Sequence, residues 1–221
     1  MPAAARTPED PPLRRKANKQ LRRQQLIEAT IVTLARRGYA RTTMTDVAVT
    51  AGLSHGLVNF HFETKEKLLT ETLQYLAKEY RDNWVRALAM ASDEPAAQLA
   101  ALIEADFNAE ICTEDRLAAW CAFWGEAQCR PIYQQECGAN DEEYGRVLEG
   151  ICARLTEEGG YPFPPERVGR VVRVTMEGVW LELMTMTKPY SREEAKRTVL
   201  TCVAAFFPRH FGVEGEVANS E

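Results

Sequence analysis

Side chains that can hydrogen-bond to nucleic acid gather between residues 43 and 65 of the 221-residue chain. His55, Asn59 and His61 can each contact base edges or phosphates, and Lys65 can contact a phosphate. The candidate DNA-contacting residues are Thr43, Thr45, Ser54, His55, Gly56, Leu57, Asn59, Phe60, His61 and Lys65. Such contacts need a scaffold that holds these side chains on one exposed surface.

Two short helices separated by a tight turn would supply that scaffold. Thr43 is predicted to cap the first helix, and Gly52 suits its end because a left-handed backbone costs little without a side chain. Ser54 then caps a second helix, in which Val58 and Phe62 point inward at i, i+4 spacing. This layout predicts a helix-turn-helix, whose second helix enters the major groove of DNA.

Lys65 begins the next predicted helix, which runs to about residue 90. Thr64 can cap this helix, so the lysine lies in the first turn beside free backbone N–H groups. The ammonium opposes the helix dipole there, but together with the N–H groups it would bind a phosphate well. We therefore favour a DNA phosphate contact for Lys65 over a plain surface lysine.

Charge is divided unevenly along the chain. The whole chain holds 27 Lys+Arg and 32 Asp+Glu. Residues 1–65 hold 11 Lys+Arg and 5 Asp+Glu, a net charge of +6. Residues 66–221 hold the remaining 16 Lys+Arg and 27 Asp+Glu, a net charge of −11. A basic DNA-binding module followed by an acidic domain would show this division. Residues 1–17 are predicted to be a disordered, proline-containing basic tail, followed by a helix over 18–37 that Gly38 ends. The basic run over 14–23 could lie along phosphates or a minor groove, or could only solubilise the chain.

A second group of side chains, in the C-terminal part, could bind a cation. Trp120 and Trp124 share one helix face at i, i+4 spacing, and Trp180 lies on another helix three residues after Glu177. The candidate ligand-binding residues are Trp120, Phe123, Trp124, Glu177, Trp180 and Met184. Converging ring faces beside a carboxylate suit a quaternary ammonium ion, which cannot donate hydrogen bonds. The alternative is that these rings are core packing, as aromatic residues at helical spacing usually are.

The remaining pattern is helical and lacks strand alternation, so the predicted fold class is all-α. Further helices are expected at about 95–112, 115–129, 131–158, 165–187 and 191–208. We predict a tail (1–17), a helix-turn-helix domain (18–65), a ligand-binding and dimerisation domain (66–211) and a frayed end (212–221).

The sequence does not indicate catalysis or membrane insertion. The chain has three histidines, two of them in the predicted helix-turn-helix, and it lacks the G-x-S-x-G, H-E-x-x-H and phosphate-loop motifs. No run approaches the roughly 18 apolar residues of a membrane helix, and no secretory signal is visible, so a cytoplasmic location is expected. The six cysteines form no C-x-x-C pair and are predicted to be core residues, and neither a metal nor a cofactor is expected.

Residues 22–70 resemble the DNA-binding domain of the TetR family of bacterial repressors. The resemblance is carried by Thr-Met-Thr-Asp-Val-Ala (43–48), Ala-Gly-Leu-Ser-His-Gly-Leu-Val (51–58), His-Phe (61–62) and Lys-Glu-Lys-Leu-Leu (65–69). It implies a homodimer on a palindromic operator, with a ligand-driven population shift that the fourth helix relays. In TetR relatives the last two helices form the dimer surface, which gives as candidate contacts Val171, Val174, Val199, Val203 and Phe206. Asn59-Phe60 departs from the family pattern, so the operator sequence does not carry over.

Three C-terminal segments resemble BetI-type choline-responsive repressors. They are Ala-Ala-Trp-Cys-Ala-Phe-Trp (118–124), Glu-Gly-Val-Trp-Leu-Glu (177–182) and Lys-Pro-Tyr-Ser (188–191). This resemblance implies choline or a related quaternary ammonium as effector, an aromatic cage made by the tryptophans, and control of glycine betaine genes. The longer N-terminus and the cysteine-rich segment 112–152 depart from it. They leave open a TetR-type regulator of efflux or catabolism that responds to another cationic or hydrophobic ligand.

Overall fold

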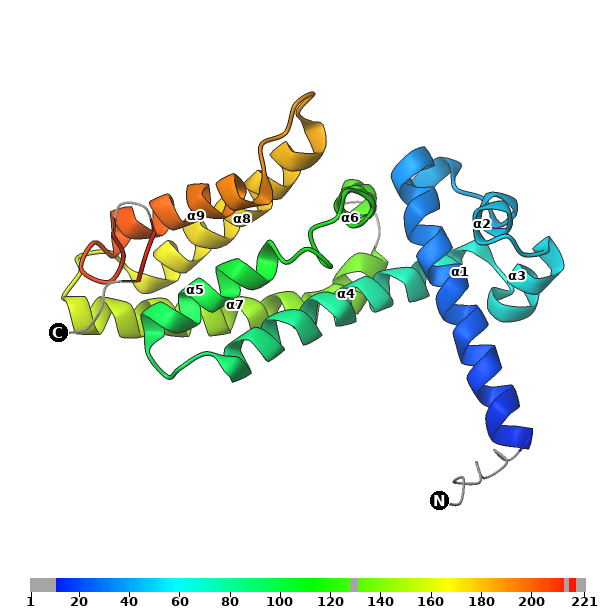
Figure 1. The fold of residues 1–221 in the computed structure, drawn as a ribbon, viewed down its shortest axis with the longest axis horizontal. Helices are drawn as coiled ribbons and strands as arrows, with labels where there is room; N and C mark the ends of the chain where they lie inside the picture. The colour runs from blue at the N-terminus through cyan, green and yellow to red at the C-terminus, as the bar shows by residue number, and fades with distance from the viewer. Residues whose placement is uncertain (1–10, 128–130, 213–214, 218–221) are drawn as a thin grey trace, which may run out of the picture.

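The computed structural model describes residues 11–127, 131–212 and 215–217. Within these ranges the chain is helical, and its only strand-like pairing is an isolated bridge between Phe211 and Val217, so the predicted all-α class is confirmed. Figure 1 shows α1–α3 gathered at one end of the molecule and α5, α7, α8 and α9 bundled at the other, with α4 running between them. The helices are α1 (Pro11–Arg41), α2 (Met44–Ala51), α3 (His55–Phe62), α4 (Lys65–Met90), α5 (Pro95–Asp106), α6 (Glu114–Ala127), α7 (Pro131–Gly159), α8 (Pro165–Thr185) and α9 (Arg192–Phe206).

The turn between α2 and α3 has the predicted capping geometry. Thr43 Oγ1 accepts a hydrogen bond from the backbone N–H of Asp46 at 3.2 Å, and Gly52 adopts the left-handed region with φ 65°. Ser54 Oγ accepts a hydrogen bond from the N–H of Leu57 at 3.3 Å. Because these groups satisfy donors that a helix end leaves free, they fix where α2 and α3 begin. The predicted helix-turn-helix is confirmed.

Helix α1 begins earlier than predicted. Its backbone is helical from Pro11, so the disordered tail is wrong for residues 11–17, while residues 1–10 lie outside the described ones. Proline is tolerated in a helix's first turn, where its missing N–H has no intrahelical partner in any case. Helical geometry breaks at Gly38 (φ 74°, ψ 170°), as predicted. The first turns of α1 project away from the rest of the molecule (Figure 1).

Helix α5 ends at Asp106 rather than near Cys112, where the pattern had predicted its end. The chain leaves the helix through a turn in which Asn108 Oδ1 accepts a hydrogen bond from the N–H of Glu110 at 2.9 Å. Such a side-chain bond offers the backbone an alternative to the next helical bond. Cys112 and its neighbour Ile111 stay buried in this connection. The early end leaves the buried carboxyl group of Asp106 at the last position of the helix.

The C-terminal segment folds back on α9. The N–H of Gly212 donates to the carbonyl of Glu216 at 2.8 Å, and Gly215 is buried with φ 85°. A Cβ atom at Gly215 would lie 2.3 Å from Cβ of Leu200, so glycine is required both for the backbone angle and for the close approach. The predicted frayed end is therefore wrong for residues 212 and 215–217. The rest of that predicted end, residues 213–214 and 218–221, lies outside the described residues.

Two of the predicted dimer contacts lie inside the protomer. Val199 and Val203 are fully buried, because the inward face of α9 packs on α8 and α5 of the same chain. The prediction is wrong for these two residues. Val171 and Val174 on α8 are exposed, with 37% and 59% of their surface accessible, and Phe206 is half-buried.

The cysteines and the helix lengths bear on two further predictions. Cys112, Cys137 and Cys152 are buried and Cys121 and Cys202 are half-buried, all five with free thiols, while Cys129 lies outside the described residues. None of the helices in the described part of the chain is long and apolar enough to cross a membrane.

Candidate DNA-binding surface and ligand cavity

Helix α3 presents most of its predicted contact residues to solvent. His55, Asn59 and Phe60 are exposed, and 69% of the Phe60 surface is accessible. Thr45 Oγ1 of α2 lies 3.2 Å from His55 Nδ1, so the two short helices share one polar edge. Of the other predicted contacts near this edge, Thr43, Thr45, Ser54 and Gly56 are exposed and Leu57 is half-buried.

His61 is the exception among the predicted DNA contacts. Its side chain is buried, and its Nδ1 has no hydrogen-bond partner among the described residues. His61 follows the core residue Val58 by three positions, so it lies on the inward side of α3. Burial lowers the pKa of its imidazole, and the charges of Arg23 and Lys19 lower it further. The predicted DNA contact is therefore wrong for the His61 side chain.

Lys65 ties α4 to the end of α1. Its Nζ donates hydrogen bonds to the carbonyl oxygens of Ala40 at 3.0 Å and Tyr39 at 3.2 Å, and it lies 5.8 Å from the centre of the Tyr39 ring. An ammonium group has a further N–H donor, which leaves one for a phosphate. The phosphate contact remains a prediction, to which these bonds add a structural role.

A row of cations on α1 adjoins the exposed face of α3. Lys16, Lys19 and Arg22 are exposed and follow one another at a spacing of three residues. Lys19 Nζ lies 5.9 Å from the centre of the Phe60 ring, and no acidic residue occurs in the sequence from 11 to 27. Part of the predicted basic tail is thus a helical edge beside the recognition helix.

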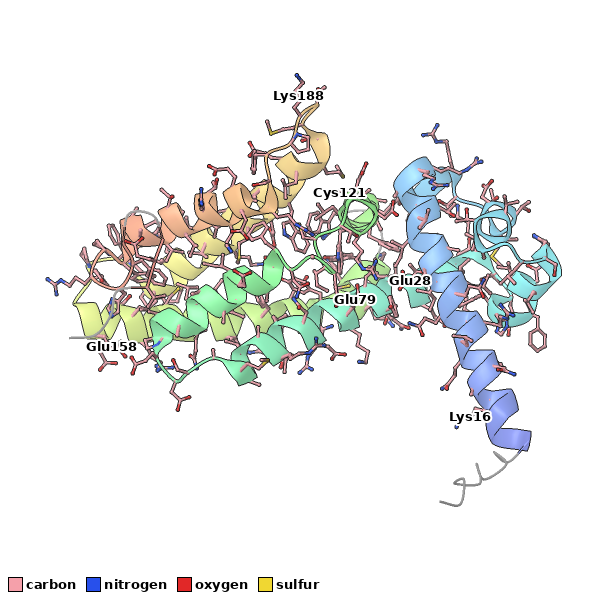
Figure 2. The ribbon with its side chains drawn as sticks, viewed as in Figure 1. Lys16, Glu28, Glu79, Cys121, Glu158 and Lys188 are labelled. Atoms are coloured by element: carbon pink, nitrogen blue, oxygen red, sulfur yellow. The ribbon has the colours of Figure 1, made fainter. Side chains whose placement is uncertain are left out.

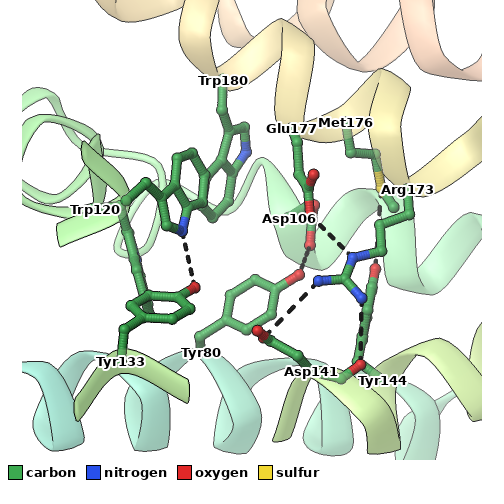
Figure 3. Close-up of a pocket in the computed structure, with 11 residues that line it drawn as sticks. Tyr80, Asp106, Trp120, Tyr133, Asp141, Tyr144, Arg173, Met176, Glu177 and Trp180 are labelled. Atoms are coloured by element: carbon green, nitrogen blue, oxygen red, sulfur yellow. Dashed lines mark hydrogen bonds and ion pairs between the residues drawn. The ribbon is translucent and has the colours of Figure 1, made fainter. Parts of the chain in front are cut away.

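A second candidate site is a cavity among α4–α8 (Figure 3), with a volume of about 60 Å³. Its lining residues are Tyr80, Asp106, Trp120, Trp124, Tyr133, Asp141, Tyr144, Arg173, Met176, Glu177 and Trp180. The structure thus brings together the three tryptophans and Glu177, which were predicted from spacing alone.

Aromatic rings form most of the wall. Trp124 and Trp180 stack with ring centres 6.4 Å apart and planes inclined by 21°, and Trp120 lies 6.2 Å from Trp124. The ring of Tyr80 meets that of Trp180 edge to face at 5.8 Å. Trp124 Nε1 donates a 2.9 Å hydrogen bond to Tyr133 Oη, which orients both rings.

Three carboxylates and one guanidinium line the same cavity. Arg173 Nε donates to Glu177 Oε1 at 2.9 Å, and Arg173 Nη2 lies 3.9 Å from Asp141 Oδ1. Tyr80 Oη donates to Asp106 Oδ1 at 2.8 Å. Burial raises the pKa of Asp106 to about 7, although the Tyr80 hydrogen bond opposes that rise. Burial likewise raises the pKa of Asp141.

Two predicted ligand residues do not line the cavity. Phe123 is one position before Trp124 on α6, and the helical rotation between them turns its ring to α1, 5.9 Å from the ring of Tyr39. Met184 is four residues beyond Trp180 and half-buried outside the cavity wall. The structure removes both residues from the predicted ligand set.

Several lining residues were not predicted, namely Tyr80, Asp106, Tyr133, Asp141, Tyr144, Arg173 and Met176. Asp106 does carry a signal in the sequence. It continues the apolar stripe of Leu99, Leu102 and Ile103, so it places an acid where the helical period demands a core residue. Asp141 carries the same signal, because it falls between Cys137 and Tyr144 on the buried stripe of α7.

The first turn of α6 contacts the DNA-binding end through Arg116, four residues before Trp120. Arg116 lies where α1, α4 and α6 meet, and its Nη2 is 3.3 Å from Oε1 of Glu28 on α1. Its Nε and Nη2 each donate a 2.7 Å hydrogen bond to the carboxylate of Glu79 on α4. Figure 2 shows Glu28 and Glu79 close together at this junction. One helix therefore carries cavity-lining tryptophans and contacts to α1.

Comparisons with known proteins agree with this architecture. Residues 26–72 match the bacterial regulatory proteins of the tetR family, and residues 95–208 match the C-terminal domain of BetI-type transcriptional repressors. The chain belongs to the BetI-type repressors of the TetR family. Members are DNA-binding transcriptional regulators rather than enzymes, and they act as dimers that bind operator DNA and small-molecule effectors.

Curated relatives carry the same assignment. The chain is 28% identical over 181 residues to the HTH-type transcriptional regulator BetI of Paraburkholderia xenovorans, covering 81% of this chain and 90% of the relative. It is also 28% identical to BetI of Stenotrophomonas maltophilia, over 83% of this chain and 91% of the relative. A BetI of Agrobacterium fabrum is 38% identical over 108 residues, about half of each chain.

Solved structures share the fold. A transcriptional regulator of Pseudomonas aeruginosa PAO1 superposes with a TM-score of 0.72 at 26% identity, covering 88% of this chain and 93% of the other. A transcriptional regulator of Saccharomonospora viridis, solved in complex with choline, superposes with a TM-score of 0.69 at 19% identity, covering 81% of this chain and 94% of the other.

Proposed function

We propose that this repressor senses choline or a closely related quaternary ammonium compound and controls genes of osmoprotectant (glycine betaine) metabolism. The observation that carries the proposal is the composition of the cavity wall. It combines three tryptophans and three tyrosines with three carboxylates against one guanidinium. Ring faces attract a cation that has no N–H to donate, each contributing about 0.5–2 kcal/mol.

The charge balance of the cavity favours a cation. Arg173 is already bonded to Glu177 and lies near Asp141, so its positive charge is neutralised within the wall. Asp106 is the remaining carboxyl group, and its bond from Tyr80 leaves it without a cationic partner among the described residues. A bound cation would supply the missing positive charge, because a buried carboxylate is costly until it is paired.

The size of the cavity favours a compact ligand over a bulky one. The volume is about 60 Å³, so a multi-ring dye would require a larger movement of the wall than a choline-sized cation. This observation supports a choline-sized effector over the alternative of a drug-responsive efflux regulator. The BetI names of the relatives and the choline in one structural neighbour point the same way.

The proposed output is a change in the spacing of two recognition helices. A two-fold dimer would place two copies of α3 about one DNA turn apart on a palindromic operator. The exposed residues His55 and Asn59 would contact base edges, with Lys65 on a phosphate. Ligand shifts this equilibrium only by the difference between its affinities for the two spacings.

The contacts suggest α6, in addition to the predicted α4, as the route between the two sites. Trp120 and Trp124 of α6 line the cavity, while Phe123 and Arg116 of the same helix contact α1 or the α1–α4 junction. A displacement of the tryptophans by ligand would therefore move the residues that support the helix-turn-helix.

Calorimetry tests the ligand assignment. Choline is titrated into wild type and into Trp180→Ala, with Met184→Leu as a control because Met184 lies outside the cavity. We expect wild type and Met184→Leu to bind with similar affinity, and Trp180→Ala to lose at least tenfold, since a ring face and its packing are removed. Equal binding by wild type and Trp180→Ala would overturn the cage.

A thermal-shift panel separates the two ligand classes. Choline and betaine aldehyde should raise the melting temperature of wild type by mass action, whereas bulky cationic dyes should not. The reverse pattern would favour the regulator of efflux or catabolism.

A further inference from the structure

One polar atom in the cavity wall lacks a partner. The side chain of Trp180 is 5% exposed, and its Nε1 makes no hydrogen bond within the described residues. An indole N–H can only donate, and leaving such a donor buried and unpaired costs about 1–3 kcal/mol. Figure 3 shows the indole nitrogen on the ring edge turned toward Glu177. The hydrogen bonding of the cavity wall is thus unsatisfied at Trp180 Nε1.

The neighbouring tryptophan shows what is missing. Trp124 stacks on Trp180, but its Nε1 donates to Tyr133 Oη at 2.9 Å. Two carboxylates of the wall already accept bonds from other donors, Glu177 Oε1 from Arg173 and Asp106 Oδ1 from Tyr80. No acceptor among the described residues bonds to Trp180 Nε1, and because Trp180 lines the cavity, a bound ligand can supply the missing acceptor.

We propose that Trp180 Nε1 donates a hydrogen bond to an uncharged oxygen of the ligand, so that Trp180 makes the cavity select an oxygen-bearing quaternary ammonium over a purely alkyl one. The proposal rests on the proposed function, because it presupposes that the rings hold the ammonium head. Choline and betaine aldehyde carry such an oxygen two carbons from the nitrogen. A carboxylate in that place would be repelled by the wall, because its three acidic groups outnumber its one guanidinium.

The experiment compares choline with propyltrimethylammonium, in which a methyl group replaces the hydroxyl. Both are titrated calorimetrically into the full-length protein. We expect wild type to bind choline roughly tenfold more tightly, since only choline satisfies the indole donor. Trp180→Phe keeps a smaller ring face but removes the N–H, so both ligands should weaken and the preference for choline should fall to about onefold.

Trp124→Phe is the matched control. It removes an indole N–H that Tyr133 already binds, so it should weaken both ligands alike and leave the choline preference intact. The inference would be overturned if wild type bound the two ligands equally or if Trp180→Phe kept the preference. It would also be overturned if glycine betaine, titrated into wild type as a third ligand, bound more tightly than choline. Binding of neither ligand by wild type would overturn the proposed function instead.

A measurement on the unmutated protein covers the case in which Trp180→Phe does not fold. The chain has four tryptophans and therefore four indole N–H signals in a nitrogen-15 spectrum. One of these protons should move downfield when choline is added and stay in place with propyltrimethylammonium. Identical shifts with both ligands would contradict the hydrogen bond.

Discussion

Arg116 and Glu79 form a two-bond ion pair, with Nε and Nη2 of the guanidinium each 2.7 Å from a carboxylate oxygen. The pair joins α6 to α4, and Glu28 of α1 lies 3.3 Å from the same guanidinium. Both carboxylates share one cation that is 17% exposed, so a single guanidinium bonds α6 to α4 and also lies beside the carboxylate of α1.

Arg116→Met should therefore loosen this junction. We expect the free energy of unfolding to fall by about 1.5–3 kcal/mol in urea denaturation, because hydrogen bonds to charged groups are lost. Choline affinity in the absence of DNA should stay within about threefold, since Arg116 does not line the cavity, while the effect of choline on operator affinity should shrink. Arg81→Met is the control, because Arg81 forms a similar pair with Glu143 away from α1. Equal losses of choline response in both variants would contradict the role of the junction.

His55→Ala and Asn59→Ala should each weaken operator binding by about 1–3 kcal/mol, the range for loss of a good base contact. Binding to unrelated duplex DNA should hardly change, since phosphate contacts dominate it. Fluorescence anisotropy with operator and scrambled duplexes measures both. If the double variant His55→Ala/Asn59→Ala binds operator as tightly as wild type does, these two residues of α3 do not contact base edges in the major groove.

His61→Leu should keep operator affinity, because the wild-type side chain is buried. It should also change the response to acid. Burial lowers the pKa of folded His61 below its model-peptide value of 6.5, so the unfolded chain takes up this proton first and stability is lost as the pH falls below that value. Urea unfolding at pH 8 and pH 5.5 should show a smaller acid loss in the variant than in wild type. A folded variant that no longer binds operator would restore His61 to the DNA-contacting set.

Choline affinity should rise with pH between 6 and 8. Burial raises the pKa of Asp106 to about 7, and a bound cation favours the ionised form, so binding releases a proton. The groups that face Asp106 are Tyr80, which donates to it, and the charges of Glu177 and Arg173. Calorimetry in buffers of different ionisation enthalpy should detect the released proton in wild type.

Asp106→Asn should remove most of that pH dependence and weaken choline at pH 8. The same change should stabilise the free protein at pH 8. The folded-state pKa of Asp106 is raised, so wild type loses stability as the pH climbs toward 7, whereas Asn can still accept from Tyr80 without a charge. A pH profile that persists in the variant would assign the proton to another group.

Val174→Asp should dissociate the dimer, because it places a charge on the exposed apolar face of α8. We expect a smaller mass in analytical ultracentrifugation, a retained helical circular dichroism spectrum and a large loss of operator affinity. Val85→Asp is the matched control on α4, where the valine is also exposed. A dimer that survives Val174→Asp would place the interface elsewhere.

The helix-turn-helix could be predicted from interactions between neighbouring residues, whereas only part of the cavity lining could be predicted from the sequence. The caps at Thr43 and Ser54 and the left-handed Gly52 depend on neighbours within a few residues, so they follow from the sequence. Tyr133 and Asp141 reach the cavity because α7 packs against α4 and α6, and the helical period of α7 marks its inward face without showing which helices pack on it.

The apolar faces of the last helices show the same limit. Val199 and Val203 at i, i+4 spacing are equally suited to a core or to an interface, and only the packed chain shows that they belong to the core. Val174, by contrast, is exposed and therefore available for an interface, and its residue type alone does not indicate this.

Because α6 contacts both the cavity and α1, its packing has a consequence for the choline concentration at which such a regulator would respond in a cell. If the helix couples the cavity to the operator, thermodynamic reciprocity requires DNA to change choline affinity by the same factor by which choline changes DNA affinity. The dose that switches transcription is then governed by the operator-bound protein and differs from the dissociation constant of the free protein. Extra copies of the operator would shift that threshold without any change in the amino-acid sequence.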